Sequence, residues 1–136
     1  MKYLKLYEEY YDGEDEVFSF LTKRYDVKKA WELIHENPEN YELDTIKLSA
    51  IEKWFGIPRV KEDGTKYFTA GVSINRDYAN SIPEDKLDEP GIFIEDGDFS
   101  FPIDGWHRAY RKWINGDIDM KIYTIDKEED IDKIRL

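Results

Sequence analysis

The run from Gly91 to Gly116 constrains the fold more than any other part of the sequence. Residues 91–94 predict a strand, residues 95–98 a tight acidic turn, and residues 99–103 the returning strand. A helix is predicted from Gly105 to about Asn115, because apolar residues recur there at the spacing of one buried stripe: Trp106, Ala109, Tyr110, Trp113 and Ile114. A strand hairpin that leads directly into an amphipathic helix indicates a small α+β domain with a mixed sheet and a few packed helices.

The rest of the chain also alternates between short strands and helices. Strands are predicted at 3–7, within 17–21, at 41–47 with Leu43 and Ile46 in the core, and at 120–125, with a hairpin over 59–68 that turns on Asp63-Gly64. Helices are predicted from the N-cap Asp26 to Asn37-Pro38, from the capping box at Ser49 to Gly56, and for a final turn or two after Asp126. Residues 71–90 are predicted to be mostly loop, with one helical turn near 83–87.

Composition excludes several classes of protein. The sequence has no internal repeat, low-complexity tract or Gly/Ser linker, so a single domain over residues 1–136 is expected. With no Cys, the chain has no disulfides, thiolate zinc sites or cysteine catalysis. A net charge of −11 makes direct DNA binding and binding to acidic membranes unfavourable. No signal-peptide or membrane-spanning stretch is recognisable, so a cytoplasmic protein is expected.

The charge is distributed unevenly along the sequence. Residues 84–104 contain eight acidic residues and one basic residue, whereas residues 105–115 contain three basic residues and no acidic one. The change of sign falls at the junction between the predicted strand and helix, where Asp104 is expected to cap the helix and Gly105 to allow a close approach. Four residues of this helix, His107, Arg108, Arg111 and Lys112, fall off the buried stripe and are expected to face solvent or a cleft. Because a helix N-terminus is partly positive, His107 and Arg108 are unfavourable in its first turn. Either they bind an anion, typically phosphate, or they pair with nearby acids and pack.

The run Ile103-Asp104-Gly105-Trp106-His107-Arg108-Ala109-Tyr110 resembles the ParB/sulfiredoxin-like superfamily, whose members carry an Asp-Gly-His-His-Arg type of motif between a strand and a helix. The resemblance extends from about Pro90 to Asp126, one third of the chain. It implies an α+β fold whose motif helix holds nucleotide phosphates at its N-terminus, with His107 and Arg108 in the positions of the family's His-Arg pair.

Several features depart from that family. Trp106 stands where sulfiredoxins have their reactive Cys, so sulfinic-acid reduction is excluded. The sequence stops about twenty residues after the motif helix, without the helix-turn-helix domain of ParB, so centromere binding is not expected. Phosphoryl transfer, as in the free-serine kinases of the superfamily, stays open, although their second catalytic carboxylate has no match here.

The resemblance therefore predicts a nucleotide or phosphate site, as in a phosphotransferase or a nucleotide hydrolase. Its expected ligand is a nucleotide (ATP, ADP or CTP) with Mg²⁺ or a phosphorylated small molecule. The predicted catalytic residues are Asp104, His107 and Arg108; the predicted ligand-binding residues are Gly105, Trp106, His107, Arg108 and Arg111. Asp104 is either a cap or a cap that also touches a phosphate-bound metal. Trp106 is either core or a stacking surface for a base. The acids of the 95–98 turn are either ordinary turn residues or a second set of Mg²⁺ ligands.

Two other functions compete with this one. A net charge of −11 also suits a non-catalytic acidic protein that binds a basic protein partner, as a mimic of nucleic acid would. A ParB-like nuclease is the third hypothesis, which the missing basic surface disfavours.

Overall fold

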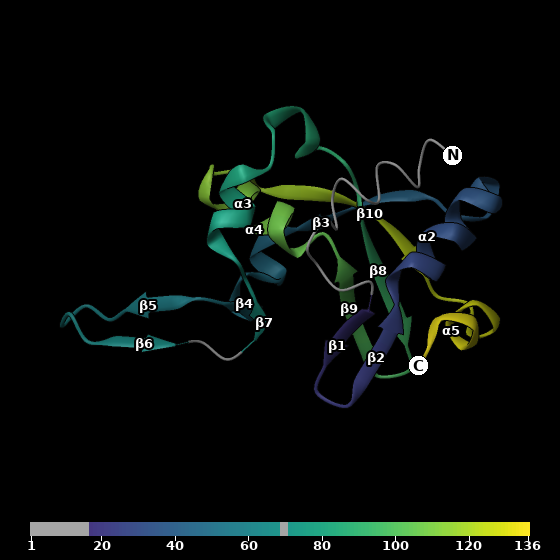
Figure 1. Cartoon of the computed structure of the whole chain (residues 1–136), viewed down its shortest axis with the longest axis horizontal. Coiled ribbons are helices and arrows are strands. Elements are labelled where there is room, and N and C mark those ends of the chain that lie inside the picture. Colours follow the sequence, from purple (N-terminus) through teal and green to yellow (C-terminus); the bar gives the residue numbers. More distant parts are fainter. Residues whose placement is uncertain (1–16, 69–70) are drawn as a thin grey trace. The chain divides into compact units, whose positions relative to one another are not determined.

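The computed structural model describes residues 17–68 and 71–136, which combine helices and strands in an α+β arrangement (Figure 1). The expected strand at 3–7 lies outside the described residues. The chain divides into two compact units. Among the described residues the first unit comprises 17–42, 92–104 and 123–136, and the second comprises 43–91 and 105–122. One boundary between the two units along the chain therefore falls between Asp104 and Gly105.

The first unit contains strands, helices and one 3₁₀ turn: β1 (Val17–Phe20), β2 (Lys23–Asp26), α2 (Val27–Glu36), η1 (Pro38–Asn40), β8 (Gly91–Asp96), β9 (Phe99–Asp104) and α5 (Glu128–Ile134). Strands β1 and β2 form an antiparallel hairpin, and β8 and β9 form another in which Ile94 pairs with Phe101. The β8–β9 hairpin and the C-terminal helix confirm the predictions made from the sequence.

Helix α2 begins where its N-cap predicts. The Asp26 carboxylate accepts the backbone N–H of Lys29 at 2.9 Å, which satisfies a donor that the helix itself leaves unpaired. The helix ends at the C-cap Asn37, ahead of Pro38. Its apolar stripe joins the core of the unit, which consists of Tyr25, Val27, Ala30, Leu33, Ile34, Ile92, Ile94, Ile103, Ile125, Ile131 and Ile134.

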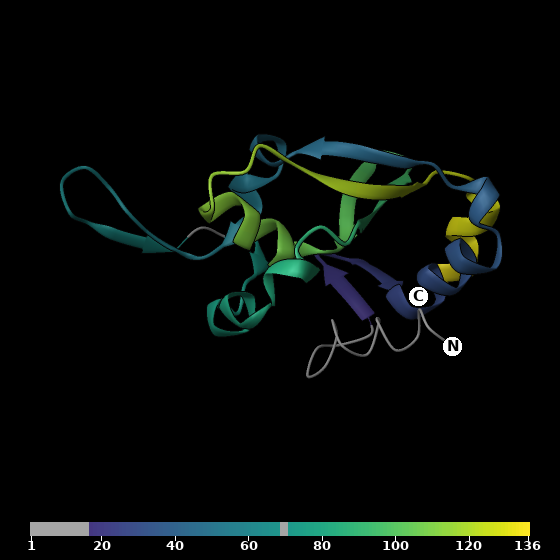
Figure 2. The same ribbon diagram turned by 90° about the horizontal axis from the view of Figure 1, so that it is seen from above.

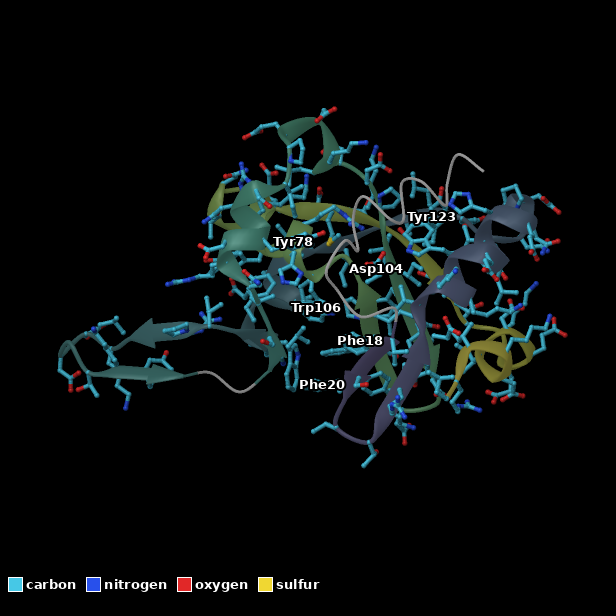
Figure 3. The ribbon with its side chains drawn as sticks, in the orientation of Figure 1. Phe18, Phe20, Tyr78, Asp104, Trp106 and Tyr123 are labelled. Carbon is cyan, nitrogen blue, oxygen red and sulfur yellow. The ribbon has the colours of Figure 1, made fainter. Side chains whose placement is uncertain are left out.

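Aromatic rings continue this core over β9. Phe20 stacks on Phe101 with ring centroids 4.9 Å apart, and Phe18 lies 6.0 Å from the same ring (both labelled in Figure 3). Phe99 lies 5.3 Å from Phe101 and 6.0 Å from Tyr25. The β1–β2 hairpin is thus held on β9 by aromatic pairs.

The second unit contains shorter elements: β3 (Leu43–Lys47), η2 (Leu48–Ala50), η3 (Glu52–Trp54), β4 (Phe55–Gly56), β5 (Pro58–Val60), β6 (Lys66–Phe68), β7 (Val72–Ser73), α3 (Arg76–Ser81), η4 (Glu84–Lys86) and α4 (Trp106–Ile114). Strand β10 (Asp119–Ile125) runs from this unit into the first, and the four-stranded sheet has the order β3-β10-β8-β9. The predicted hairpin is present as β5–β6, with Gly64 at a positive φ of 86° in its turn.

Three sequence predictions fail in the second unit. The capping box at Ser49 starts no α-helix, because 3₁₀ turns η2 and η3 occupy the segment and the chain then enters β4. Leu43 is 50 % exposed rather than in the core, and Ile46 is only partly buried. Residues 76–81, predicted as loop, form helix α3, whose N-cap Asn75 accepts the N–H of Tyr78 at 3.0 Å.

Phe55 lies at the centre of the second unit's core. It is fully buried and meets the rings of Trp106, Tyr110 and Trp113 at centroid distances of 6.0, 5.7 and 5.3 Å. Helix α4 thus packs the stripe that its sequence predicts, although Ile114 at its end is 47 % exposed. None of the described helices is long and apolar enough to cross a membrane.

Candidate functional site

Helix α4 begins at Gly105, the N-cap, in a left-handed conformation with φ of 97°. A Cβ on this residue would lie 3.1 Å from the Gly91 Cα and 3.2 Å from the Met120 Cε, closer than side chains ordinarily approach. The predicted close approach at Gly105 is therefore confirmed. The prediction that Asp104 is the N-cap is wrong, because the left-handed turn places the cap one residue later.

The Asp104 carboxylate accepts a hydrogen bond within the first unit. Its side chain is buried, with a residue exposure of 4 %, and its Oδ2 accepts the indole N–H of Trp31 at 2.8 Å. Trp31 in turn meets the Tyr123 ring edge-on at 6.1 Å (Asp104 and Tyr123 are labelled in Figure 3). The bond from the indole compensates part of the cost of burying this carboxylate.

His107 fixes the start of helix α3. Its Nε2 accepts the backbone N–H of Asn75 at 3.0 Å, and its ring meets Tyr78 edge-on at 5.0 Å. These two contacts connect the first turn of α4 to the start of α3.

Arg108 is buried, with 4 % of the residue exposed, whereas the sequence places it off the buried stripe and facing solvent or a cleft. Its Nε donates to the Glu89 carbonyl at 3.2 Å, and its Nη2 donates to the Pro90 carbonyl at 3.0 Å. The sequence prediction fails because segment 82–91 covers this side of α4 and presents backbone carbonyls to it. A guanidinium group is well suited to this role, since it carries five donors in a planar fork.

Arg111 binds the C-terminal end of α3. Its Nη1 donates to the carbonyls of Ala79, Asn80 and Ile82 at 3.1, 3.1 and 3.2 Å, and its Nη2 donates to Glu84 at 3.2 Å. A helix leaves its last carbonyls without intrahelical partners, and a cation there also complements the helix dipole. Arg111 thus caps α3 from a neighbouring helix.

Lys112 is also buried, against the expectation that it faces solvent or a cleft. Its Nζ lies 3.2 Å from the Asp88 Oδ1 and 3.2 Å from the Asp117 Oδ2. Burial alone would lower the pKa of Lys112, but the hydrogen bonds to these two carboxylates outweigh it and leave the pKa raised. The side chain is therefore charged and paired.

The two members of each of these α4 ion pairs differ strongly in solvent exposure. The side chains of Arg111 and Lys112 are 15 % and 11 % exposed, whereas those of their partners Glu84 and Asp88 are 81 % and 85 % exposed. The positive member of each pair lies inside the unit while the negative member stands in solvent. The surface around these pairs therefore presents carboxylates.

Trp106 is 4 % exposed and meets Phe55 edge-on, which favours its interpretation as core over one as a stacking surface for a base. Trp113 donates its indole N–H to the Glu52 carboxylate at 2.7 Å. Both rings hold α4 on the core of the second unit.

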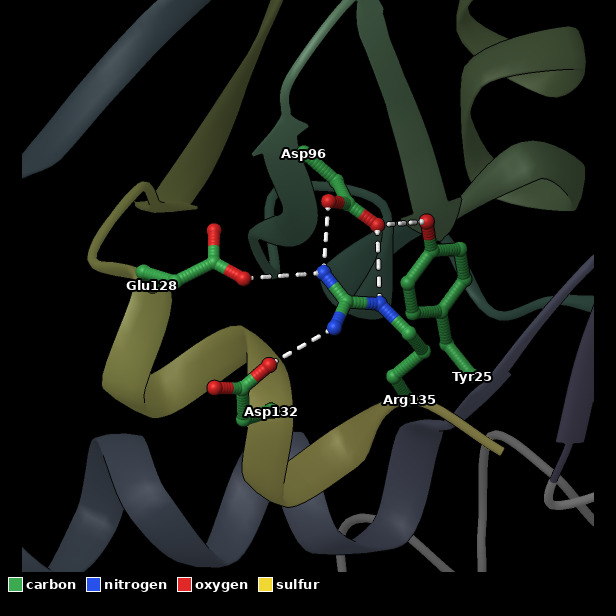
Figure 4. A network of polar contacts seen from close by, with 5 residues as sticks. All are labelled: Tyr25, Asp96, Glu128, Asp132 and Arg135. Carbon is green, nitrogen blue, oxygen red and sulfur yellow. Dashed lines mark hydrogen bonds and ion pairs between the residues drawn. The ribbon is translucent and has the colours of Figure 1, made fainter.

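A polar network in the first unit was not predicted from the sequence (Figure 4). The Arg135 Nη2 lies 2.7 Å from the Asp96 Oδ1 and 3.2 Å from the Glu128 Oε1, and its Nη1 lies 2.6 Å from the Asp132 Oδ1. The Tyr25 hydroxyl donates to the Asp96 Oδ2 at 2.7 Å. No local sequence pattern predicts this cluster, because its residues come from distant parts of the chain: β2, β8, α5 and the residue after it.

The residues fit a metal poorly. No group of three or more His, Asp or Glu side chains within 17–68 and 71–136 could hold a metal ion. Asp96, one of the predicted turn ligands, is instead bound by Arg135 and Tyr25. The predicted nucleotide faces a similar difficulty, because Arg108 and Arg111, its predicted phosphate ligands, already bind carbonyls.

No family model, curated protein or solved structure matches this chain in the comparisons with known proteins.

Proposed function

We propose that this chain is a non-catalytic binding protein whose exposed carboxylates take up a basic protein partner. The observation that carries the proposal is the unequal exposure within the α4 ion pairs, in which the side chains of Arg111 and Lys112 are 15 % and 11 % exposed while Glu84 and Asp88 stand in solvent. Cations inside the unit hold the carboxylates in place without covering them. A partner rich in Lys and Arg meets negative groups that are already ordered.

The binding site consists of the acidic loop, which we define as residues 84–88. Its exposed acids are Glu84, Asp85 and Asp88, and Leu87 is buried below them. The 3₁₀ turn η4 and the bonds from Arg111 and Lys112 position the loop. A preorganised loop loses less conformational entropy on binding than a mobile acidic tail would.

The test measures the affinity of a fluorescent oligolysine peptide at low and high salt. The triple variant Glu84→Gln/Asp85→Asn/Asp88→Asn should bind about tenfold more weakly at low salt. The control Glu36→Gln/Glu39→Gln/Glu42→Gln removes the same charge from exposed acids elsewhere and should bind nearly as the parent does. Equal losses in both variants, or binding that does not change with salt, would contradict the proposal.

An anion site at the start of α4 is the second candidate, and it is the one that the ParB-like resemblance implies. The Arg108 Nη2 lies 3.4 Å from the position that a Cβ of Gly105 would occupy. A buried cation therefore lies beside the N-terminus of α4, which is itself partly positive, and this arrangement favours an anion. A thermal-shift series with ATP, ADP, CTP and inorganic phosphate tests it. A stabilisation by one of these that disappears in Arg108→Lys supports an anion site, and no shift with any of them removes this candidate.

A further inference from the structure

The β5–β6 hairpin is built differently from the rest of the second unit. Its strands are joined through a turn in which Lys61 and Thr65 are bonded, N to O at 2.8 Å, and the Asp63 carboxylate accepts the Thr65 N–H at 2.9 Å. In both views the hairpin extends away from α3 and α4 (Figures 1 and 2). A two-stranded hairpin without further packing is marginally stable in water. A surface that covers this hairpin would therefore stabilise it.

The base of the hairpin is anchored in the unit. The Arg59 Nη2 donates to the Glu52 carbonyl at 2.9 Å, and the guanidinium lies 5.7 Å over the Trp113 ring. Trp113 is bonded to the Glu52 carboxylate in turn. The hairpin thus starts from an ordered root, which determines its direction and leaves its outer part in solvent.

Each face of the outer hairpin combines an apolar side chain with a lysine. On one face Val60, 64 % exposed, is paired across the strands with Lys66. On the other face Tyr67, 44 % exposed, has the Lys61 Nζ 5.8 Å from its ring centre. Such a surface suits a partner that offers carboxylates for the lysines and area to bury the apolar groups.

The charge of the hairpin is opposite to that of the rest of the chain. Residues 58–68 contain three basic and two acidic residues, a net charge of +1, whereas the remaining residues carry −12. Arg59 is bound at the root and Asp63 within the turn, which leaves Lys61, Lys66 and Glu62 as the other charged residues of the hairpin. The same chain therefore offers both a basic, partly apolar arm and the exposed acidic loop.

We propose that the β5–β6 hairpin is a docking arm for a second copy of this chain, and that it binds the acidic loop of that copy. The inference rests on the proposed function, since it names the basic partner of the loop. In a two-fold dimer each copy contributes one arm and one loop, so the contact is made twice and the assembly closes. Lys61 meets the carboxylates, and Tyr67, which lies on the same face of the hairpin, is buried in the contact.

Sedimentation equilibrium over a range of protein concentrations tests the proposal, with the parent chain and Lys61→Glu/Lys66→Glu compared at low salt. The parent should dimerise, and the variant should dissociate about tenfold more readily. The control Lys23→Glu/Lys47→Glu, which makes the same charge change outside the hairpin, should dimerise like the parent. A carbodiimide cross-link between labelled and unlabelled copies should join hairpin lysines to residues 84–88.

A parent chain that stays monomeric at every concentration would overturn the docking arm, as would cross-links that bypass the loop. The oligolysine titration repeated on Lys61→Glu/Lys66→Glu separates the two proposals. If that variant still binds oligolysine through the acidic loop while the parent is monomeric, the proposed function stands and the docking arm fails. If the peptide does not bind either, both proposals fail.

Discussion

Arg135 binds Asp96 at two points, with Nη2 2.7 Å from Oδ1 and Nε 3.3 Å from Oδ2, although 39 residues separate them. Asp96 is only 8 % exposed, and the guanidinium provides its counter-charge. The Tyr25 hydroxyl completes the group (Figure 4). The pair therefore connects the end of the chain to strand β8 inside the first unit.

Replacing Arg135 by Ala should destabilise the protein, because it leaves the Asp96 carboxylate buried without its cation. Breaking such a pair costs several kcal/mol in a closed interior, and partial exposure of Arg135 reduces the expected loss to about 2 kcal/mol. Urea unfolding measures it. Lys133→Ala, which removes an exposed cation from α5, is the control, and an equal loss in both variants would count against this role.

Acid should weaken the same pair. The hydrogen bond from Arg135 lowers the pKa of Asp96 below its ordinary value of 3.8 and outweighs the effect of burial. The unfolded chain then binds this proton at a higher pH than the folded chain, so stability is present above pH 3.8 and falls as the pH drops toward the folded pKa. Asp96→Asn should flatten the unfolding free energy in this range; an unchanged acid slope would contradict the assignment.

Two glycines at similar backbone angles should respond differently to alanine. Gly116 has φ of 86° and open space around it, so Gly116→Ala should cost only the left-handed conformation, about 1 kcal/mol. Gly105→Ala should cost more, because its Cβ would also press against Gly91 and Met120. Thermal unfolding compares the two, and equal losses would show that the close approach at Gly105 is unimportant.

Arg108 should act as a structural residue. Arg108→Ala removes both donors to the Glu89 and Pro90 carbonyls and should destabilise the protein by about 1–3 kcal/mol. Hydrogen exchange should rise in residues 82–91 in particular. Arg76→Ala, an exposed arginine of α3 in the same unit, should change neither quantity. Unchanged exchange in residues 82–91 of Arg108→Ala would refute this assignment.

Leu21 is a place where a substitution should stabilise the protein. It has a positive φ of 56° and is 84 % exposed in the turn between β1 and β2. Asn tolerates this conformation better than Leu, so Leu21→Asn should raise the unfolding free energy by up to about 1 kcal/mol. Thr22→Asn, at the neighbouring turn residue, should not. A loss of stability in Leu21→Asn would mean that the leucine side chain makes a stabilising contact.

Local signals in the sequence predicted those elements whose causes are local. The Asp26 cap with its apolar stripe, the Asp63-Gly64 turn, and the hairpin before α4 depend on neighbouring residues, and all are confirmed. The capping box at Ser49 shows the limit, since the chain is drawn into 3₁₀ turns and β4 by the burial of Leu48, Ile51 and Phe55. Helix α3 was missed because arginine and histidine side chains of α4 hold both of its ends.

The sequence by itself determined the α+β class, most of the strand and helix positions and the reversal of charge at the Asp104-Gly105 junction. Only the tertiary structure decided which groups the charged side chains of α4 contact, because their partners lie in a segment that is distant in the sequence. Segment 82–91 offers carbonyls and carboxylates to Arg108, Arg111 and Lys112. These bonds compensate the desolvation of the cations, which are largely withdrawn from solvent, while Glu84 and Asp88 stay exposed.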